Sequence, residues 1–336
     1  MPQRTTSSVW LRGLLASLAE RGADIPVLLS DVGVSATSLN DDSRRWPTDV
    51  VSHLWECAVS RSSDPALGVH LAEHVRPAQY GVVGYAMMSS PVLRVGIERL
   101  VRYLRLVSDA ATISLQEVPQ GAKVSLELAR GVREIPRQRV EYALLTLFSL
   151  CRWVTGGSLR AIEATFQAPQ PVDATDFTGM LRCPITFGAD SNSFTLSHAD
   201  LDAALPTAMP SLETFHERIA RTGLSRLRNS EFEVRVHAAV QARLQDGRPL
   251  RAQIAADLGT SDRTFQRRLL ERGTSFEAMV ESTRKELAEQ YLLERTVSAM
   301  QIAFMLGYAD ERSFARACVR WFGVPPGRFS ERVAEA

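Results

Sequence analysis

The spacing of apolar positions predicts both helices and strands in the first 205 residues. Apolar residues recur at helical intervals from Val9 to Leu18, just before Gly22, and predict an amphipathic helix over residues 7–21. Residues 112–129 instead alternate between apolar and polar on both sides of a Pro-Gln-Gly turn, which predicts a β-hairpin. Similar patterns predict helices at 48–61, 65–75, 81–89, 92–107 and 137–155, and strands at 160–166, 184–187 and 193–196.

A proline-rich stretch marks the end of this mixed segment. Pro206 and Pro210 restrict the backbone both at their own positions and at the preceding residues. After them, Leu212, Phe215 and Ile219 form an apolar stripe at helical spacing. The stripe predicts a linker helix that either packs on its own domain or forms a contact between two copies of the chain.

The C-terminal third contains one pattern twice. The motif I-A-x-x-L-G begins at Ile254 and again at Ile302, 48 residues later. Gly259 and Gly307 close the two copies, where a chain that leaves a helix needs a positive φ. An Arg-rich helical segment follows each glycine. Two helices joined by a glycine-containing turn predict a helix-turn-helix in each copy.

The second helix of each copy is predicted to be amphipathic. It would bury Phe265 and Leu269 in the first copy and Phe314 and Val319 in the second, with its arginines on the opposite face. The net charge of the whole chain is only +1, and so is that of residues 230–336, but residues 259–272 carry +2 and residues 311–328 carry +3. Positive charge is thus concentrated on the two helices expected to face DNA.

Residues 230–336 resemble the double helix-turn-helix domain of AraC-type bacterial transcription regulators. The resemblance rests on residues 263–269, 273–276, 302–308, 320–326 and Phe329, and Ser330 departs from it because arginine is common at that place. It implies that one set of residues faces bases, namely Arg263, Gln266, Arg267, Glu311, Arg312 and Arg316. It also implies that Ser261, Ser313 and Arg320 contact phosphates. Arginine can bridge guanine O6 and N7, and glutamine adenine N6 and N7.

A helix over residues 276–293 is predicted to join the two helix-turn-helix units. At 1.5 Å per residue it would be about 27 Å long. This approaches the ~34 Å of one turn of DNA, so one chain could place both recognition helices in successive major grooves. The expected binding site is about 20 base pairs per subunit.

The N-terminal part resembles the arabinose-binding type of domain found on one branch of these regulators. The likeness rests on residues 64–68, 80–85 with 89–91, and 183–189. It implies a regulatory domain, although the family name is no argument for arabinose as the ligand. The aromatic and flexible side chains proposed to line a ligand pocket are Tyr80, Tyr85, Met88 and Trp153.

These patterns predict an α+β protein with three segments. A mixed helix and strand domain for effector binding or oligomerisation occupies residues 1–205, a linker residues 206–229, and an all-α domain with two helix-turn-helix units joined by a long helix residues 230–336. We expect a transcription regulator that binds double-stranded promoter DNA and RNA polymerase. A small-molecule effector and a homodimer are further possible partners, and no cofactor is expected.

The alternative is an enzyme with an accessory DNA-binding domain. His70, Glu73 and His74 spell the H-x-x-E-H pattern of one metalloprotease group, and Cys57 could be an alkyl acceptor in DNA repair. An exposed helix face and a buried small residue explain these positions better, because no G-x-S-x-G, C-x-x-C or P-loop accompanies them. We predict no metal site and no catalytic residue. The sequence shows no signal peptide or membrane span, which favours the cytoplasm.

Overall fold

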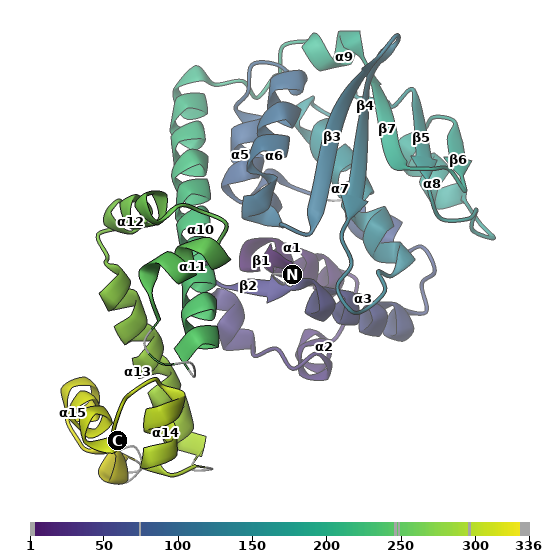
Figure 1. The fold of residues 1–336 in the computed structure, drawn as a ribbon. Coiled ribbons are helices and arrows are strands. Elements are labelled where there is room, and N and C mark those ends of the chain that lie inside the picture. The colour runs from purple at the N-terminus through teal and green to yellow at the C-terminus, as the bar shows by residue number, and fades with distance from the viewer. Residues whose placement is uncertain (1–3, 74, 245–246, 248, 295–296, 330–336) are drawn as a thin grey trace. The chain divides into compact units, whose positions relative to one another are not determined.

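The computed structural model describes residues 4–73, 75–244, 247, 249–294 and 297–329. The chain divides into two compact units, Met1–Ser225 and Arg226–Ala336. Figure 1 labels most of their elements along the chain. His74 of the H-x-x-E-H pattern and Ser330, which departs from the AraC-type pattern, lie outside the described residues.

The first unit contains most of the helices. Their bounds are α1 Ser8–Glu20, α2 Ile25–Asp31, η1 Ala36–Asn40, α3 Thr48–Ser62, α4 Leu67–Ala72, η2 Pro77–Tyr80, α5 Val82–Met88, α6 Leu93–Val107, α7 Arg137–Val154, α8 Thr175–Leu181 and α9 His198–Asp202. The six helices predicted from apolar spacing, α1 and α3 to α7, are confirmed. Helices α2, α8 and α9 were not predicted, because elements of five to seven residues span too few turns to show a helical period.

A five-stranded sheet completes the first unit. Its strands are β3 Ala111–Val118, β4 Gly121–Leu128, β7 Asn192–Ser197, β5 Glu163–Phe166 and β6 Ile185–Phe187, in that order across the sheet. All neighbours are antiparallel except β5 and β6, as Figure 1 allows the reader to follow. The predicted hairpin is confirmed as β3 and β4, and the three predicted strands are present as β5, β6 and β7. The small sheet of β1 Thr5–Ser7 and β2 Arg45–Pro47 was not predicted.

The core of this unit is built around α7. Phe148, in the middle of the helix, is fully buried and meets Phe194 of β7 edge to face, with ring centroids 5.4 Å apart. On another side α7 packs against α4, where a Cβ on Gly68 would lie 2.3 Å from the backbone oxygen of Gln138. Helix α7 is therefore enclosed between the sheet and other helices, which accounts for its apolar residues on nearly every face.

Helix α10 spans Pro210–Leu244. Of the two alternatives predicted for its apolar stripe, packing on its own domain is wrong. The side chains of Leu212, Phe215 and Ile219 are exposed. The buried face of this part of the helix instead carries Ala220 and Leu224, near two glutamates that pair with arginines of α6. The half-buried glutamates meet partners on this face, which lowers the cost of removing them from water.

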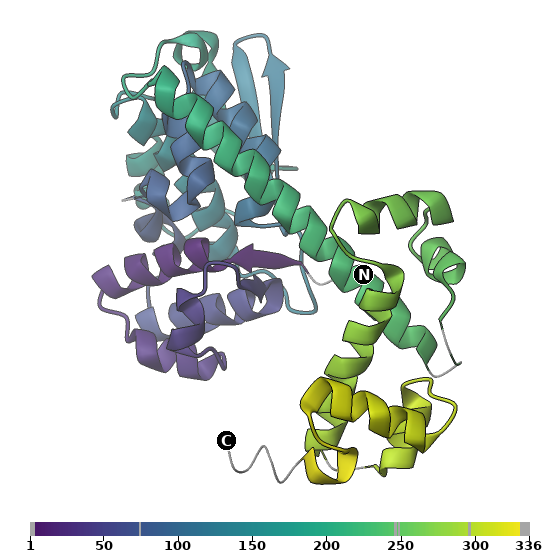
Figure 2. The same ribbon diagram turned by 90° about the vertical axis from the view of Figure 1, so that its left-hand side faces the viewer.

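The second unit is all-helical. Its elements after α10 are α11 Arg251–Asp257, α12 Asp262–Leu270, α13 Phe276–Glu294, α14 Ala299–Met305 and α15 Glu311–Phe322. Helix α13 joins the pair α11 and α12 to the pair α14 and α15, as Figure 2 shows, so the predicted pair of helix-turn-helix units with a joining helix is confirmed. Gly259 and Gly307 both have φ +68°, as the turn between the helices requires.

The prediction that Val319 of α15 is buried in the core is wrong. Val319 is exposed, and Cys318 is fully buried beside Phe314 instead. Residues four positions apart share a helix face, whereas Val319 lies five positions from Phe314 and turns away from it. The second recognition helix therefore packs through residues at the same spacing as Phe265 and Leu269 in the first.

Alanine substitutions at the two turn glycines should differ in their effect on stability. At Gly259 nothing lies within 4 Å of an added Cβ, so only the positive φ opposes alanine, at about 1–2 kcal/mol. At Gly307 the new Cβ would also lie 2.7 Å from the backbone oxygens of Leu244 and Gly247. We expect Gly307→Ala to lower the free energy of unfolding by more than Gly259→Ala. Urea titrations of both variants measure this, and equal losses would contradict it.

Candidate nucleic-acid interface

Helix α12 is fixed at its start by polar contacts and along one face by apolar burial. The Ser261 hydroxyl oxygen accepts a hydrogen bond from the backbone N–H of Thr264 (3.3 Å) and so caps the helix. Asp262 pairs with Arg251 of α11 through two contacts of 2.7 and 2.8 Å, which ties the two helices together. Phe265 then fills the core of the unit. The orientation of α12 about its own axis is thereby set.

The opposite face of α12 carries the side chains that the sequence predicts to face bases. Arg263, Gln266 and Arg267 are all exposed, and together they line one hollow on the surface. Their spacing of three and four residues places them on one helix face. Arg267 makes one weak ion pair, 3.5 Å from Glu271. All three side chains can reach outward from this face.

Helix α15 repeats this arrangement with different capping chemistry. Asp310 caps it by accepting hydrogen bonds from the backbone N–H of Ser313 (2.7 Å) and from its hydroxyl (2.9 Å). The predicted base-facing residues Glu311, Arg312 and Arg316 are exposed and line one hollow. Arg316 also donates to the Ser313 hydroxyl oxygen (2.9 Å). The structure thus brings together the predicted residues of each helix.

Two residues of α13 hold the second helix-turn-helix, α14 and α15, in place. Neither residue was predicted from the sequence. Glu281 accepts hydrogen bonds from Arg320 and from the Trp321 indole (2.8 Å). Arg284 donates to the backbone oxygens of Leu306 (2.8 Å) and Gly307 (3.0 Å). Helix α13 carries several charged residues of both signs, so no sequence pattern distinguishes these two as structural contacts. Both hold the α14–α15 pair to the joining helix.

The three predicted phosphate-contacting residues occupy different environments. Ser261 is exposed at the start of α12, and Ser313 is half-buried at the start of α15. Arg320 is exposed but paired with Glu281. A helix N-terminus favours anions, because its first backbone N–H groups lack partners inside the helix. Ser261 therefore lies where a phosphate would meet a helix start, whereas Ser313 already donates to Asp310 and Arg320 is paired with Glu281.

Comparison with known proteins identifies the two units. A family model described as the arabinose-binding domain of AraC transcription regulators matches residues 22–205, and a helix-turn-helix domain model matches residues 254–332. The first match alone spans more than half of the chain. The chain belongs to the AraC family of transcription regulators. It is accordingly a DNA-binding transcription regulator with an N-terminal regulatory domain.

Relatives of this AraC-type regulator match it over most of its length. The ornithine utilization regulator of Pseudomonas aeruginosa is 26% identical over 328 residues, which cover 96% of this chain and 95% of the relative. The regulator VirS of Mycobacterium tuberculosis is 26% identical over 279 residues, covering 82% and 81% of the two chains. The crystal structure of the transcriptional regulator CdpR from P. aeruginosa aligns over 96% of this chain and 98% of its own, at 22% identity and a TM-score of 0.46.

The residues predicted to bind an effector in this AraC-type regulator differ in their surroundings. Tyr80 is buried, lines a cavity, and donates its hydroxyl to Thr146 (3.0 Å). Tyr85 is 39% exposed and stacks on His216 with ring centroids 5.8 Å apart. Met88 is half-buried, and the side chain of Trp153 is 42% exposed. Of the four, Tyr80 lines this cavity and the other three do not.

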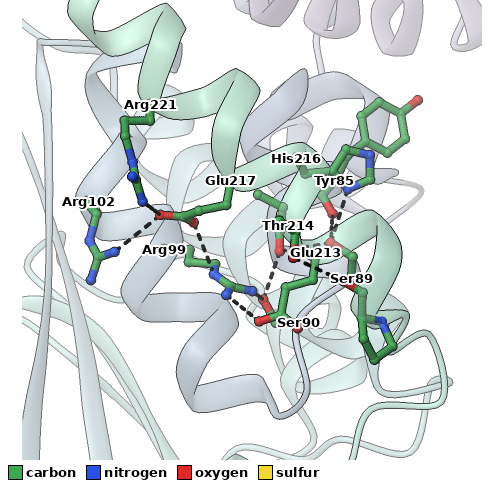
Figure 3. A network of polar contacts seen from close by, with 12 residues as sticks. Tyr85, Ser89, Ser90, Arg99, Arg102, Glu213, Thr214, His216, Glu217 and Arg221 are labelled. Carbon is green, nitrogen blue, oxygen red and sulfur yellow. Dashed lines mark hydrogen bonds and ion pairs between the residues drawn. The ribbon is translucent and has the colours of Figure 1, made fainter.

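A polar network holds the first turns of α10 to α5 and α6 (Figure 3). Arg99 of α6 contacts Glu213 at 2.5 Å and Glu217 at 3.3 Å. Tyr103, also of α6, donates its hydroxyl to Glu217 (2.5 Å). From the other side His216 lies 3.1 Å from the Ser89 hydroxyl. The N-terminal part of α10 is therefore bound to the regulatory domain mainly through charged and hydrogen-bonding groups.

His70 and Cys57, the residues on which the enzyme alternative rests, lie in surroundings that do not favour catalysis. The two ring nitrogens of His70 contact Asp64 (2.8 Å) and Asp176 (3.1 Å). Burial alone would lower the pKa of His70, but these carboxylates raise it above its ordinary value. Burial also raises the pKa of Cys57, which disfavours a reactive thiolate. Among the described residues, no group of three potential ligands could hold a metal ion, and no helix is long and apolar enough to cross a membrane.

Loss of the Glu281 carboxylate should strengthen binding to any DNA. Glu281→Gln keeps an oxygen for Trp321 but removes the charge that holds Arg320, so Arg320 becomes available to phosphates. We expect affinity for random duplex to rise about twofold or more at low salt, with a salt dependence steeper by up to about one phosphate contact. Fluorescence anisotropy titrations at several salt concentrations measure both quantities.

Glu289→Gln provides the matched control for this experiment. Glu289 lies on the same helix, is exposed, and loses the same charge. It should change affinity less than Glu281→Gln. Identical effects of the two variants would mean that net charge alone is responsible.

Proposed function

We propose that this regulator reads promoter DNA specifically through α12 and α15. The proposal rests on one observation. Each of the two helices buries a phenylalanine on one face and exposes arginines on the other. Arg263, Arg267, Arg312 and Arg316 would bridge guanines, and Gln266 an adenine. Glu311 is suited to accept a hydrogen bond from a cytosine amino group.

The length of α13 sets the spacing of the two contacts. The helix has 19 residues, and at 1.5 Å per residue it is about 28 Å long. We propose that α12 and α15 enter successive major grooves on one side of the duplex, which are ~34 Å apart. Ser261, Ser313 and Arg320 would contact phosphates and fix the register, and Arg320 could do so while it keeps one N–H on Glu281.

We further propose that the N-terminal segment controls the DNA-binding segment through α10. Residues 1–205 would bind an effector or a second subunit, residues 206–229 would act as the linker, and residues 230–336 would bind DNA. Helix α10 supplies Ala220 and Leu224 to the core of the first unit and Phe232, Val236, Val240 and Leu244 to that of the second. A ligand that changes how α10 is held would thereby shift the equilibrium between two states of the regulator.

The remaining partners follow from this role. Control of transcription requires RNA polymerase at the same promoter, and a homodimer would raise affinity for paired sites by effective concentration. The exposed Leu212, Phe215 and Ile219 of α10 are available for such a contact. We assign no residue a catalytic role and expect no bound metal. Stoichiometric zinc in the purified protein that disappears in His70→Ala would favour the enzyme instead.

Genomic mapping of bound sites, followed by footprinting on them, tests the proposed DNA binding directly. On an identified site, Arg267→Ala and Arg316→Ala should each weaken binding by about 1–3 kcal/mol and relax the preference at one base position. Competition titrations with single-base variants of the site measure the preference.

Arg268→Ala is the control for this pair. Arg268 lies on α12 but points toward the Phe232 ring, 5.9 Å from its centroid, so base preference should persist when it is removed. If Arg316→Ala also kept every base preference, α15 would contact only the backbone of the DNA.

The polar anchor of α10 has its own test. Glu217→Gln removes the carboxylate charge that binds Arg99 and the Tyr103 hydroxyl. We expect the amides of residues 210–224 to lose about 1–3 kcal/mol of protection from hydrogen exchange. Hydrogen exchange with mass spectrometry resolves this segment. Arg221→Gln is the control, because Arg221 is mostly exposed and lies 3.7 Å from the same glutamate. Unchanged protection in Glu217→Gln would show that apolar packing alone holds the helix.

A further inference from the structure

Helices α12 and α15 each carry an exposed apolar side chain at the same place. Leu270 of α12 is 66% exposed, and Val319 of α15 is 49% exposed. The two residues lie 49 positions apart, which is also the offset between Phe265 and Phe314, the buried phenylalanines of the two helices. Leu270 and Val319 therefore occupy equivalent positions in the two helix-turn-helix copies.

Leu270 lies on the face of α12 that is proposed to meet DNA. It follows Arg263 by seven residues and Arg267 by three, and this spacing keeps the three side chains on one side of the helix. Leu270 also lines the same surface hollow as these two arginines. Val319 has the same spacing from the two arginines of α15 that are proposed to face bases. Each DNA-facing surface thus contains one large apolar side chain among its charged groups.

Packing inside the protein does not account for these two side chains. Their chain neighbours Leu269 and Cys318 are buried, whereas neither Leu270 nor Val319 is among the described residues that form the hydrophobic core of this unit. A single exposed apolar residue is ordinary on a protein surface. Two of them at equivalent positions on two charged helix faces point to a shared contact. That contact must be apolar, because neither side chain has a hydrogen-bonding group.

We propose that Leu270 and Val319 read thymine in the operator through its C5-methyl group. This methyl is the apolar feature that thymine presents in the major groove, and apolar side chains recognise it by contact. The inference rests on the proposed function, because it takes α12 and α15 to lie in major grooves. DNA is the occupant that fits, since arginines flank each apolar side chain and their positive charge matches the phosphates.

The helical rise predicts where these thymines lie in the operator. Leu270 comes three residues after Arg267, which is about 4.5 Å along the axis of α12. Successive bases of one DNA strand are ~3.4 Å apart. The thymine read by Leu270 is therefore expected within about two base pairs of the guanine read by Arg267. The same relation holds between Val319 and Arg316 on α15.

A deoxyuridine scan of a footprinted operator tests the inference with the full-length protein. Deoxyuridine pairs as thymidine does and lacks only the C5-methyl. Replacement of either thymine should weaken binding about two- to fivefold, as expected for one buried methyl group. Leu270→Ala should make binding insensitive to deoxyuridine at its own position and leave the other position sensitive, and Val319→Ala should do the converse. Competition titrations by fluorescence anisotropy measure all of these affinities.

Val234→Ala is the matched control. Val234 is an exposed apolar residue of α10 in the same unit, outside the two recognition helices. Its loss should change neither operator affinity nor the response to deoxyuridine. Because an apolar contact displaces no counterion from a phosphate, Leu270→Ala and Val319→Ala should also keep the salt dependence of the unaltered protein. Urea titrations establish that the three variants remain folded.

The outcomes separate this inference from the proposed function. Specific binding in which no deoxyuridine effect depends on Leu270 or Val319 would overturn the inference and leave the proposed function standing. Equal losses on thymidine and deoxyuridine operators in Leu270→Ala would overturn it too, because the side chain would then act without the methyl. Unchanged DNA affinity in both variants, with transcription by purified RNA polymerase lost, would assign this face to a protein partner instead. A protein that selects no DNA sequence would refute the proposed function itself.

Discussion

Burial of one stripe on each recognition helix is the constraint on which the DNA-binding unit depends. Phe265 and Leu269 of α12, and Phe314 and Cys318 of α15, are almost fully enclosed. A helix held by such a stripe cannot rotate about its axis without exposing apolar area, at roughly 25 cal/mol per Å². The helix face that carries the arginines therefore keeps a fixed direction in the absence of DNA. Preorganised side chains bind with less loss of conformational freedom.

Polar contacts add to this constraint what apolar burial cannot supply. Arg251 and Asp262 link the two helices of the first copy, and Arg284 holds the backbone oxygens that follow α14 in the second. Hydrogen bonds are directional, so they fix angles and register where apolar contacts mainly fix proximity. The two copies share a sequence pattern but achieve rigidity through different partners.

The N-terminal unit distributes its charges in another way. The glutamates of α10 face arginines across a contact that is partly open to solvent, whereas Arg139 of α7 is buried and donates hydrogen bonds to Thr48 and Ser52, which are uncharged. The first arrangement can be remade at modest cost, because water can replace either partner. The second is costly to break, because a buried cation that loses its partners is strongly destabilising. The contacts that hold α10 can therefore exchange their partners, whereas the contacts of Arg139 fix α7 to α3.

The sequence by itself determined the repeated helix-turn-helix, the β3–β4 hairpin and the longer helices, because each rests on a local period or on a turn residue with a fixed backbone demand. It also placed Arg263, Gln266 and Arg267 on one face, since residues three and four apart share a helix face. Only the tertiary structure decided which face of α10 turns inward and that Cys318, not Val319, is buried in the core. It also decided what Glu281, Arg284 and Arg139 contact. Each of these depends on a partner distant in the chain, such as Arg99 for Glu217 or Thr48 for Arg139. A local pattern carries no record of which distant group will meet a given side chain.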